Sequence, residues 1–292
     1  MQIVSKLGIL LCTFIGASTI VIAEPLISVV PPIFLLAIRF TLAAALLGIV
    51  FPRRIFPVTK EAFHSGVVTG LGFGFGSALL YLALPHVRAG KLTFLIALEV
   101  VIVPLVCLAI YKQRLSFLEK VALIPATLGL WLLSGDTTTS FSWWEIVGLS
   151  SAFAYSVYTI SLSHRASSGG VMSRTFVSFV TISILALGVS YLFEPVSGIV
   201  WTRPAAIGLA YLVVAGSFIR FIVQAWAQKS VSASFTALTF TAEPIFAIAL
   251  SYTFLGERFT LAQTCGAACV IAALLIGNAP TNNRGDSMIL PT

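Results

Sequence analysis

Apolar residues occur along the chain in long unbroken runs, separated by short segments rich in proline, glycine and charged residues. A run of about 20 apolar residues is long enough to cross a bilayer as a helix, in which the backbone satisfies its own hydrogen bonds. We expect ten such spans, at residues 7–24, 33–51, 64–84, 91–110, 118–135, 143–164, 172–193, 204–226, 233–255 and 260–279. The pattern predicts an all-α polytopic membrane protein.

Composition supports the same class. Charged residues make up only 9% of the chain, against about 25% in soluble domains, and the mean hydropathy of +1.03 excludes a soluble globular domain. Strands of outer-membrane barrels alternate in segments of about ten residues and seldom give apolar runs of this length. The net charge of +7 therefore does not indicate nucleic-acid binding, because basic residues in a membrane protein set its orientation.

The distribution of lysine and arginine predicts that orientation. With the N-terminus inside, eleven basic residues fall in inner segments and four in outer ones, while Arg39 and Arg220 lie within spans. Both termini should then be cytoplasmic by the positive-inside rule, and residues 280–292 should form a short polar cytoplasmic tail. This topology suits a multi-pass protein of a bacterial inner membrane.

The chain also repeats itself. Residues 83–116 overlay residues 227–260 without a gap at an offset of 144, which places Glu99 on Glu243. The first two spans match the sixth and seventh more loosely, at an offset near 140.

Each half contains five spans, an odd number, so the second half should be inserted upside down relative to the first. We therefore expect ten transmembrane helices in two inverted five-helix repeats, at residues 1–136 and 143–279. Many secondary transporters have this architecture and bind their substrate near the bilayer midplane, between the halves.

One segment of the second repeat resembles a known family. The sequence AEPIFAIALSYTFLGERFT at residues 242–260 is similar to the second-half signature of the ten-helix EamA family, within the drug/metabolite transporter superfamily. Weaker counterparts in the first half are PPIFLLAIRF at 31–40, GFGFGSALLYLALPHVRAG at 72–90 and LEVVIVPLVCLAIYKQRLS at 98–116. The resemblance covers residues 7–279 and implies an inner-membrane secondary carrier, often an exporter of amino acids or related metabolites.

The chain departs from the family pattern at three places. Val100 follows Glu99 where a proline is common, and Lys112-Gln113-Arg114 replaces the Gly-Glu-Arg of residues 256–258. Glu24 stands where a lysine is expected at the end of the first helix. The first helix of this chain could therefore handle charge differently.

Glu243 is a carboxylate about ten residues from either end of its apolar run. Charge at the bilayer centre costs about 2.5–3.5 kcal/mol on insertion scales, so a residue at that depth is a functional-site hypothesis by default. Pro244 removes a backbone donor and leaves the carbonyl of Phe240 unpaired, which breaks the helix. A freed carbonyl is tolerated there only against protein or water. Together the two residues predict a polar cavity halfway across the membrane.

Glu99 occupies the equivalent position of the first repeat. Both glutamates could face the cavity, where they would bind a cationic group such as an ammonium or exchange a proton. The alternative is a structural role, in which each carboxylate is satisfied by an arginine or hydroxyl group of a neighbouring helix.

Arg39 and Arg220 are the cations inside apolar runs. Either could neutralise a glutamate or bind a substrate carboxylate with two parallel hydrogen bonds. For Arg39 the favoured interpretation is an internal ion pair that fixes helix register. Arg220 is followed by Gln224 and Gln228 on the same helix face, and such a polar stripe should face protein or water rather than lipid.

Aromatic residues are candidates for the cavity wall, namely Tyr81, Tyr155, Tyr158 and Trp226. Binding cavities are commonly lined by aromatic side chains with a few placed polar groups. For any one of these residues, helix packing or an interfacial position is the alternative.

Other classes of function have little support. The chain has no Ser-His-Asp grouping, no H-E-x-x-H and no Cys/His set with metal-ligand spacing, so we expect neither an enzyme nor a metal or cofactor. A scaffold or sensor would have no evident use for midplane charges.

The leading hypothesis is a secondary transporter that exports a small metabolite or amino acid by alternating access, with protons or the substrate gradient as the driving force. The alternative is uptake or exchange of a bulkier nutrient or nucleoside-type metabolite. The expected partners are a small-molecule substrate, protons and the lipid bilayer. Substrate, direction, coupling ion and oligomeric state are not determined by the sequence.

Overall fold

The structure is a computed structural model that describes residues 2–87, 89–112, 117–133, 142–164, 170–195, 199–255 and 260–277. Arg114, residues 256–258 and the tail at 280–292, which entered the sequence predictions, lie outside the described residues.

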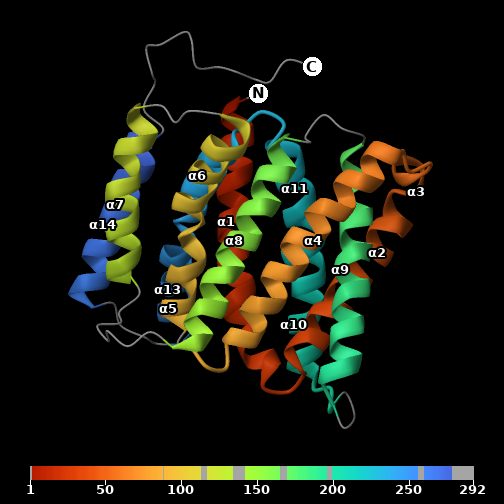
Figure 1. The fold of residues 1–292 in the computed structure, drawn as a ribbon. Coiled ribbons are helices and arrows are strands. Elements are labelled where there is room, and N and C mark those ends of the chain that lie inside the picture. Colours follow the sequence, from red (N-terminus) through yellow and green to blue (C-terminus); the bar gives the residue numbers. More distant parts are fainter. Residues whose placement is uncertain are drawn as a thin grey trace.

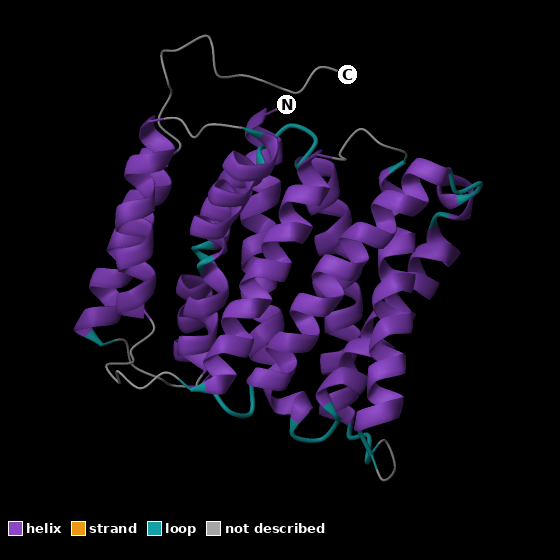
Figure 2. Cartoon of the chain, in the orientation of Figure 1, coloured by secondary structure: helices purple, strands orange, loops and turns teal. Residues whose placement is uncertain are grey.

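The described residues form helices joined by short turns and loops, without a β-strand among them (Figure 2). The continuous helices are α1 (Gln2–Ile27), α2 (Pro32–Val50), α3 (Pro52–Ile55), α4 (Lys60–Ala83), α7 (Phe117–Leu133), α8 (Trp143–His164), α9 (Val171–Phe193) and α14 (Leu261–Gly277). Three spans are interrupted, as α5 (Ala89–Ala97) with α6 (Glu99–Tyr111), α10 (Arg203–Val213) with η1 (Val214–Ile219) and α11 (Arg220–Ala227), and α12 (Ala233–Phe240) with α13 (Glu243–Leu255). Apart from the one-turn α3, these segments match the ten expected spans, so the predicted all-α class is confirmed.

Within the described part of the chain, six helices are long and apolar enough to cross a membrane, and two shorter apolar helices accompany them. The halves run in opposite directions: in Figure 1, α1 begins at the upper end of the view and α8 begins at the lower end. The two halves also interlock, because α4 packs against α8 and α9, and α1 packs against α11 and α13. Residues at the middle of the molecule therefore come from both repeats.

Local sequence signals account for where several helices begin. The side chains of Thr59, Thr202 and Ser232 each accept a hydrogen bond from a backbone amide three residues on, which caps α4, α10 and α12. Serine and threonine are favoured at this position because the first amides of a helix have no backbone acceptor. Pro32 and Pro52 begin α2 and α3, where the missing amide proton of proline costs nothing.

The ninth span breaks next to Pro244, as the sequence predicts, whereas the break of the fourth span was not predicted. The two breaks are similar. The amide of Leu98 donates to Leu95 at 3.3 Å, and in the second repeat the amide of Ala242 donates to Thr239 at 3.1 Å. These bonds to the residue three positions back tighten the backbone into a turn between two half-helices. Leu98 and Ala242 are 144 residues apart, so the break is a shared property of the repeats. Pro244 explains one copy, whereas the other breaks without a proline.

The eighth span contains a π-helical segment, η1, directly before Arg220. Such segments place one extra residue in a turn and occur often at functional sites. Nothing in the apolar pattern of the sequence predicts it.

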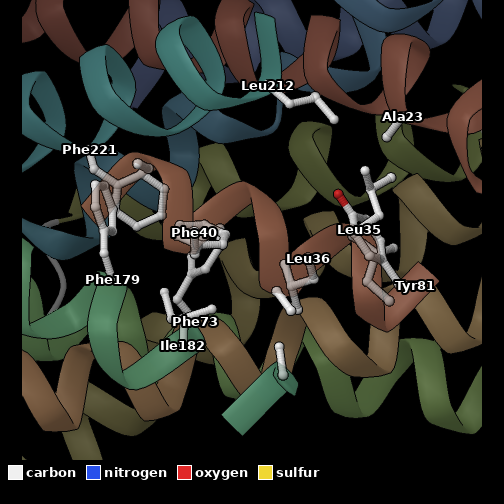
Figure 3. Packing of buried hydrophobic residues seen from close by; sticks show 14 of the residues in the cluster. Ala23, Leu35, Leu36, Phe40, Phe73, Tyr81, Phe179, Ile182, Leu212 and Phe221 are labelled. Atoms are coloured by element: carbon white, nitrogen blue, oxygen red, sulfur yellow. The ribbon is translucent and has the colours of Figure 1, made fainter. Parts of the chain in front are cut away.

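An aromatic cluster fills the centre of the largest hydrophobic core (Figure 3). Phe40, Phe73, Phe179 and Phe221 come from α2, α4, α9 and α11, and their ring centroids lie 4.6–5.7 Å apart in edge-to-face pairs. This geometry is the favoured one for aromatic pairs. Because the four rings come from both repeats, the cluster fixes the halves against each other at this level.

Candidate substrate cavity

A cavity of about 90 Å³ lies between the two repeats. Its charged lining residues are Arg39, Glu99, Arg220 and Glu243. The remaining lining residues include Gly16, Thr19, Ile20, Ala23, Phe73, Ser77, Leu80, Tyr81, Leu84, Tyr155, Tyr158, Thr159, Phe240 and Pro244. The space is large enough for several water molecules.

The cavity extends from the middle of the molecule toward one end. On α1 the lining residues run from Gly16 to Ala23, and on α4 they run from Phe73 to Leu84, the residue that caps the helix. These are the C-terminal parts of both helices, which lie at the lower end of the view in Figure 1. Phe73 belongs to both the cavity lining and the aromatic cluster, and its ring centroid lies 5.1 Å from that of Tyr158, another lining residue.

Arg220 and Glu243 form an ion pair in the cavity, with 2.8 Å between Nη2 and Oε1. Their side chains are 12% and 15% exposed. Arg220 is the first residue of α11 and Glu243 is the first residue of α13, so the π-helical segment and the break of the ninth span position the pair. The guanidinium carbon also lies 5.6 Å from the ring centroid of Phe240, a cation–π contact.

Glu99 is more deeply buried than Glu243, with 6% exposure. Its carboxylate accepts a hydrogen bond from the hydroxyl group of Thr159 on α8. Among the described residues no cation pairs with it. The two glutamates that the repeat places at equivalent positions thus have different partners.

Among the described residues, the hydrogen-bond acceptors of Arg39 are all neutral oxygens, which corrects the expected ion pair. Nε donates to Ser217 Oγ at 2.8 Å, Nη2 to the carbonyl oxygen of Gly216 at 2.8 Å, and Nη1 to Tyr81 Oη at 3.3 Å. The side chain thereby connects α2 with η1 and α4, and it still fixes one helix against another.

The polar stripe of the eighth span faces protein, as the sequence predicts. Gln224 is 1% exposed and Gln228 is 2% exposed. Tyr158 Oη donates to Gln224 Oε1 at 3.2 Å, and Gln228 Nε2 donates to Ser163 Oγ at 3.0 Å. These contacts lie on the α8 side of the cavity and continue away from it.

The structure brings most of the predicted site residues together. The cavity is lined by eight of them, namely Arg39, Tyr81, Glu99, Tyr155, Tyr158, Arg220, Glu243 and Pro244. Gln224 lies one hydrogen bond away, through Tyr158. Trp226 does not belong to the wall: it is 42% exposed, because it projects from a different face of α11 than Arg220 and Gln224.

The sequence analysis did not identify the small residues of the lining, above all Gly16 and the hydroxyl-bearing Ser77 and Thr159. A signal for Thr159 existed, because Thr19 lies 140 residues before it and occupies the matching position of the first repeat. A single threonine in an apolar run nevertheless does not indicate a binding site, since its hydroxyl group usually donates a hydrogen bond to a backbone carbonyl of its own helix.

Comparison with known proteins now decides the family. The family model described as "EamA-like transporter family" matches residues 4–135 and 142–278, once for each half. The chain belongs to the EamA family. Two relatives of this EamA protein carry transporter names: the uncharacterized transporter YoaV of Bacillus subtilis is 20% identical over 95% of this chain and 98% of its own length, and an uncharacterized transporter of Archaeoglobus fulgidus is 23% identical over 94% and 86%.

The fold of this EamA protein is also present among solved structures. A protein described only as "Crystal structure of protein" superposes with a TM-score of 0.78 and 18% identity, over 94% of this chain and 96% of that one. Family and relatives agree that the chain is a multi-pass membrane transporter of the drug/metabolite transporter superfamily.

Proposed function

We propose that this EamA transporter is a secondary carrier that exports a small metabolite or amino acid by alternating access. The observation that carries the proposal is the cavity between the inverted halves, which holds an ion pair at its centre and extends toward one end. A carrier of this architecture exposes a fixed midplane site to each side in turn, as one half moves against the other.

The chemistry of the cavity suits a small substrate with both charges and an apolar part. Arg220 Nε is buried without a hydrogen-bond partner among the described atoms, so it could donate to a substrate carboxylate. Glu243 could accept from an ammonium group, and Phe73 and Tyr155 provide apolar wall. A substrate with both charges would replace the Arg220–Glu243 ion pair by two charge-assisted hydrogen bonds. Its carboxylate would bind Arg220 and its ammonium group would bind Glu243.

The present volume of about 90 Å³ is smaller than the roughly 300–1,000 Å³ of typical ligand pockets. The cavity must therefore widen on binding, in a conformation that opens further toward the lower end of Figure 1. With both termini cytoplasmic in a bacterial inner membrane, as the distribution of basic residues predicts, that end faces outward.

Uptake or exchange of a bulkier nutrient or nucleoside-type metabolite is the second candidate. It would use the same cavity, because a secondary carrier works in both directions and gradients decide the net flux. Export is distinguished from uptake by transport in vesicles with the substrate gradient imposed in each direction.

Thermal-shift screening of the detergent-purified protein tests the binding site. Amino acids, polyamines, nucleosides and cationic drugs are added at two pH values, and a ligand present at 100 times its Kd should stabilise the protein by about 2.7 kcal/mol. The same ligand should fail to stabilise Glu243→Gln, because the variant loses its anionic contact. It should still stabilise Glu61→Gln, which alters an exposed carboxylate at the start of α4. Equal stabilisation of the wild type and Glu243→Gln would contradict the proposed site.

A further inference from the structure

The two glutamates of the cavity are equivalent by the repeat but not by their surroundings. Glu99 and Glu243 are 144 residues apart, and each is the first residue of the half-helix after a break. The same offset carries Arg220 onto Gly76. The second repeat therefore contributes an arginine for Glu243, whereas the first repeat has a glycine at the matching position.

The space at Gly76 is already occupied. A Cβ atom built there would lie 3.1 Å from the ring of Tyr155 on α8. A tyrosine ring therefore packs against α4 at the position where α11 carries the guanidinium group of Arg220. Arg39, the other arginine of the lining, bonds to Ser217, Gly216 and Tyr81. Neither arginine of the cavity lining is paired with Glu99.

Glu99 is therefore a buried carboxylate without a counter-ion among the described residues. The ionisable groups that share the cavity with it are Arg39, Tyr81, Tyr155, Tyr158, Arg220 and Glu243. An uncompensated charge at this depth is costly, and such residues usually mark ion or proton pathways. A divalent metal ion would need about six or more oxygen ligands, and the described contacts of Glu99 provide a single hydroxyl group. A proton needs only the carboxylate itself.

Polar contacts continue from the partner of Glu99 toward the opposite end of the molecule. Gln228 Nε2 lies 3.4 Å from the carbonyl oxygen of Thr159 and 3.0 Å from Ser163 Oγ. Gln224 Nε2 in turn donates to Gln228 Oε1 at 3.3 Å. Thr159 thus lines the cavity with Glu99 and is also bonded to these buried glutamines, which we call the polar seam.

We propose that Glu99 is the proton-binding site through which the carrier is coupled to the proton gradient, while Glu243 stays ionised as the partner of Arg220. The proposal rests on the proposed carrier function. In the coupled cycle, the Glu99 carboxylate takes up one proton from the cavity and becomes a neutral carboxylic acid. After the halves move, Glu99 releases that proton to water on the other side of the membrane. One charge crosses with each proton.

Infrared difference spectroscopy of the reconstituted protein tests the assignment directly. Spectra are taken in choline chloride at acidic minus mildly alkaline pH, with glutamate carboxyl groups labelled with ¹³C. The wild type should show a protonated carboxyl band that shifts with the label. The band should be lost in Glu99→Gln and kept in Glu243→Gln, the repeat-equivalent substitution. Circular dichroism and a single elution peak establish that both variants are folded.

Thr159→Val provides a readout that a merely structural role would not give. Removal of the hydroxyl group abolishes its hydrogen bond to Glu99, so the carboxyl band should change frequency without disappearing. Persistence of the wild-type band in Glu99→Gln, or its loss only in Glu243→Gln, would overturn the proposal. So would suppression of the band when sodium chloride replaces choline chloride, because sodium would then occupy the site.

The infrared experiment requires no transported substrate, so its outcome is separate from that of the carrier hypothesis. A transporter that binds and moves a ligand without a Glu99 band would keep the proposed function and lose this inference. For a ligand found in the thermal screen, accumulation driven by a pH gradient in vesicles should be lost in Glu99→Gln. Exchange of the ligand between equal pools should lose its dependence on pH in this variant.

Discussion

At the scale of single residues, the ion pair of the cavity depends on the absence of a side chain at Gly16. A Cβ atom at this position would overlap Glu243 Oε1 and lie 2.7 Å from Arg220 Nη2. Sequence reasoning identified the two charged residues, because a carboxylate and a guanidinium in apolar runs are conspicuous. It could not identify Gly16, because the need for a glycine comes from a neighbour more than 200 residues away in the chain.

Gly16→Ala should therefore displace the ion pair and destabilise the protein by about 1–3 kcal/mol, the usual cost of overpacking. Gly188→Ala is the matched control in α9, where a new Cβ atom meets nothing within 4 Å and where alanine favours the helix by up to about 1 kcal/mol. Thermal unfolding in detergent compares the two. A Gly16→Ala protein as stable as Gly188→Ala would show that the pair has room to move.

At the scale of elements, the sequence predicted where the spans lie and one of their breaks, at Pro244, but not the break of the fourth span or the π-helical segment of the eighth. The positions of apolar runs determine length and burial, and they carry no information on a backbone turn inside a run. Pro244 was a local signal for one break, while Leu98 has no such signal and was recognisable only through its repeat partner. The π-helical segment η1 is held by a distant side chain, Arg39, whose donors reach Gly216 and Ser217.

Arg39→Met should remove this connection and leave buried acceptors of η1 unsatisfied, at a cost of about 1–3 kcal/mol for each buried group left without a partner. Amide hydrogen exchange in residues 214–219 should become faster than in the wild type, because the segment loses its hydrogen bonds from Arg39 of α2. Arg53→Met, at an exposed position, is the control and should leave both properties unchanged. Equal exchange in the two variants would refute a role of Arg39 in holding η1.

At the scale of the whole molecule, the inverted repeat predicted from an offset of 144 is the fold that the structure shows. The repeat predicts a site between the halves because a pseudo-symmetric interface passes through the midplane. The extension of the cavity toward one end was not predicted, because it depends on how side chains of the two halves pack against each other and not on the pattern of apolar runs.

Cysteine accessibility should distinguish the two ends. In a protein whose four native cysteines are replaced, Leu84→Cys lies at the cavity lining, and Ala225→Cys lies at a 2% exposed position of the core that contains the aromatic cluster. A membrane-impermeant maleimide added to intact cells should label Leu84→Cys and should not label Ala225→Cys. Labelling of Leu84→Cys only in inside-out vesicles would reverse the proposed orientation.

The unequal neighbours of Glu99 and Glu243 have a consequence for the resting state. If the repeats were identical, the conformations open to either side would be related by a two-fold rotation about an axis in the membrane plane. They would then have the same free energy and be populated equally. The counterpart of Arg220 in the first repeat is Gly76. When the two halves swap conformations, Glu99 therefore cannot gain the arginine contact that Glu243 has. A difference of about 1.4 kcal/mol would already favour one conformation tenfold. In the proposed alternating-access cycle, the departure from symmetry gives the empty transporter a preferred side, and this side determines which compartment meets the binding site first.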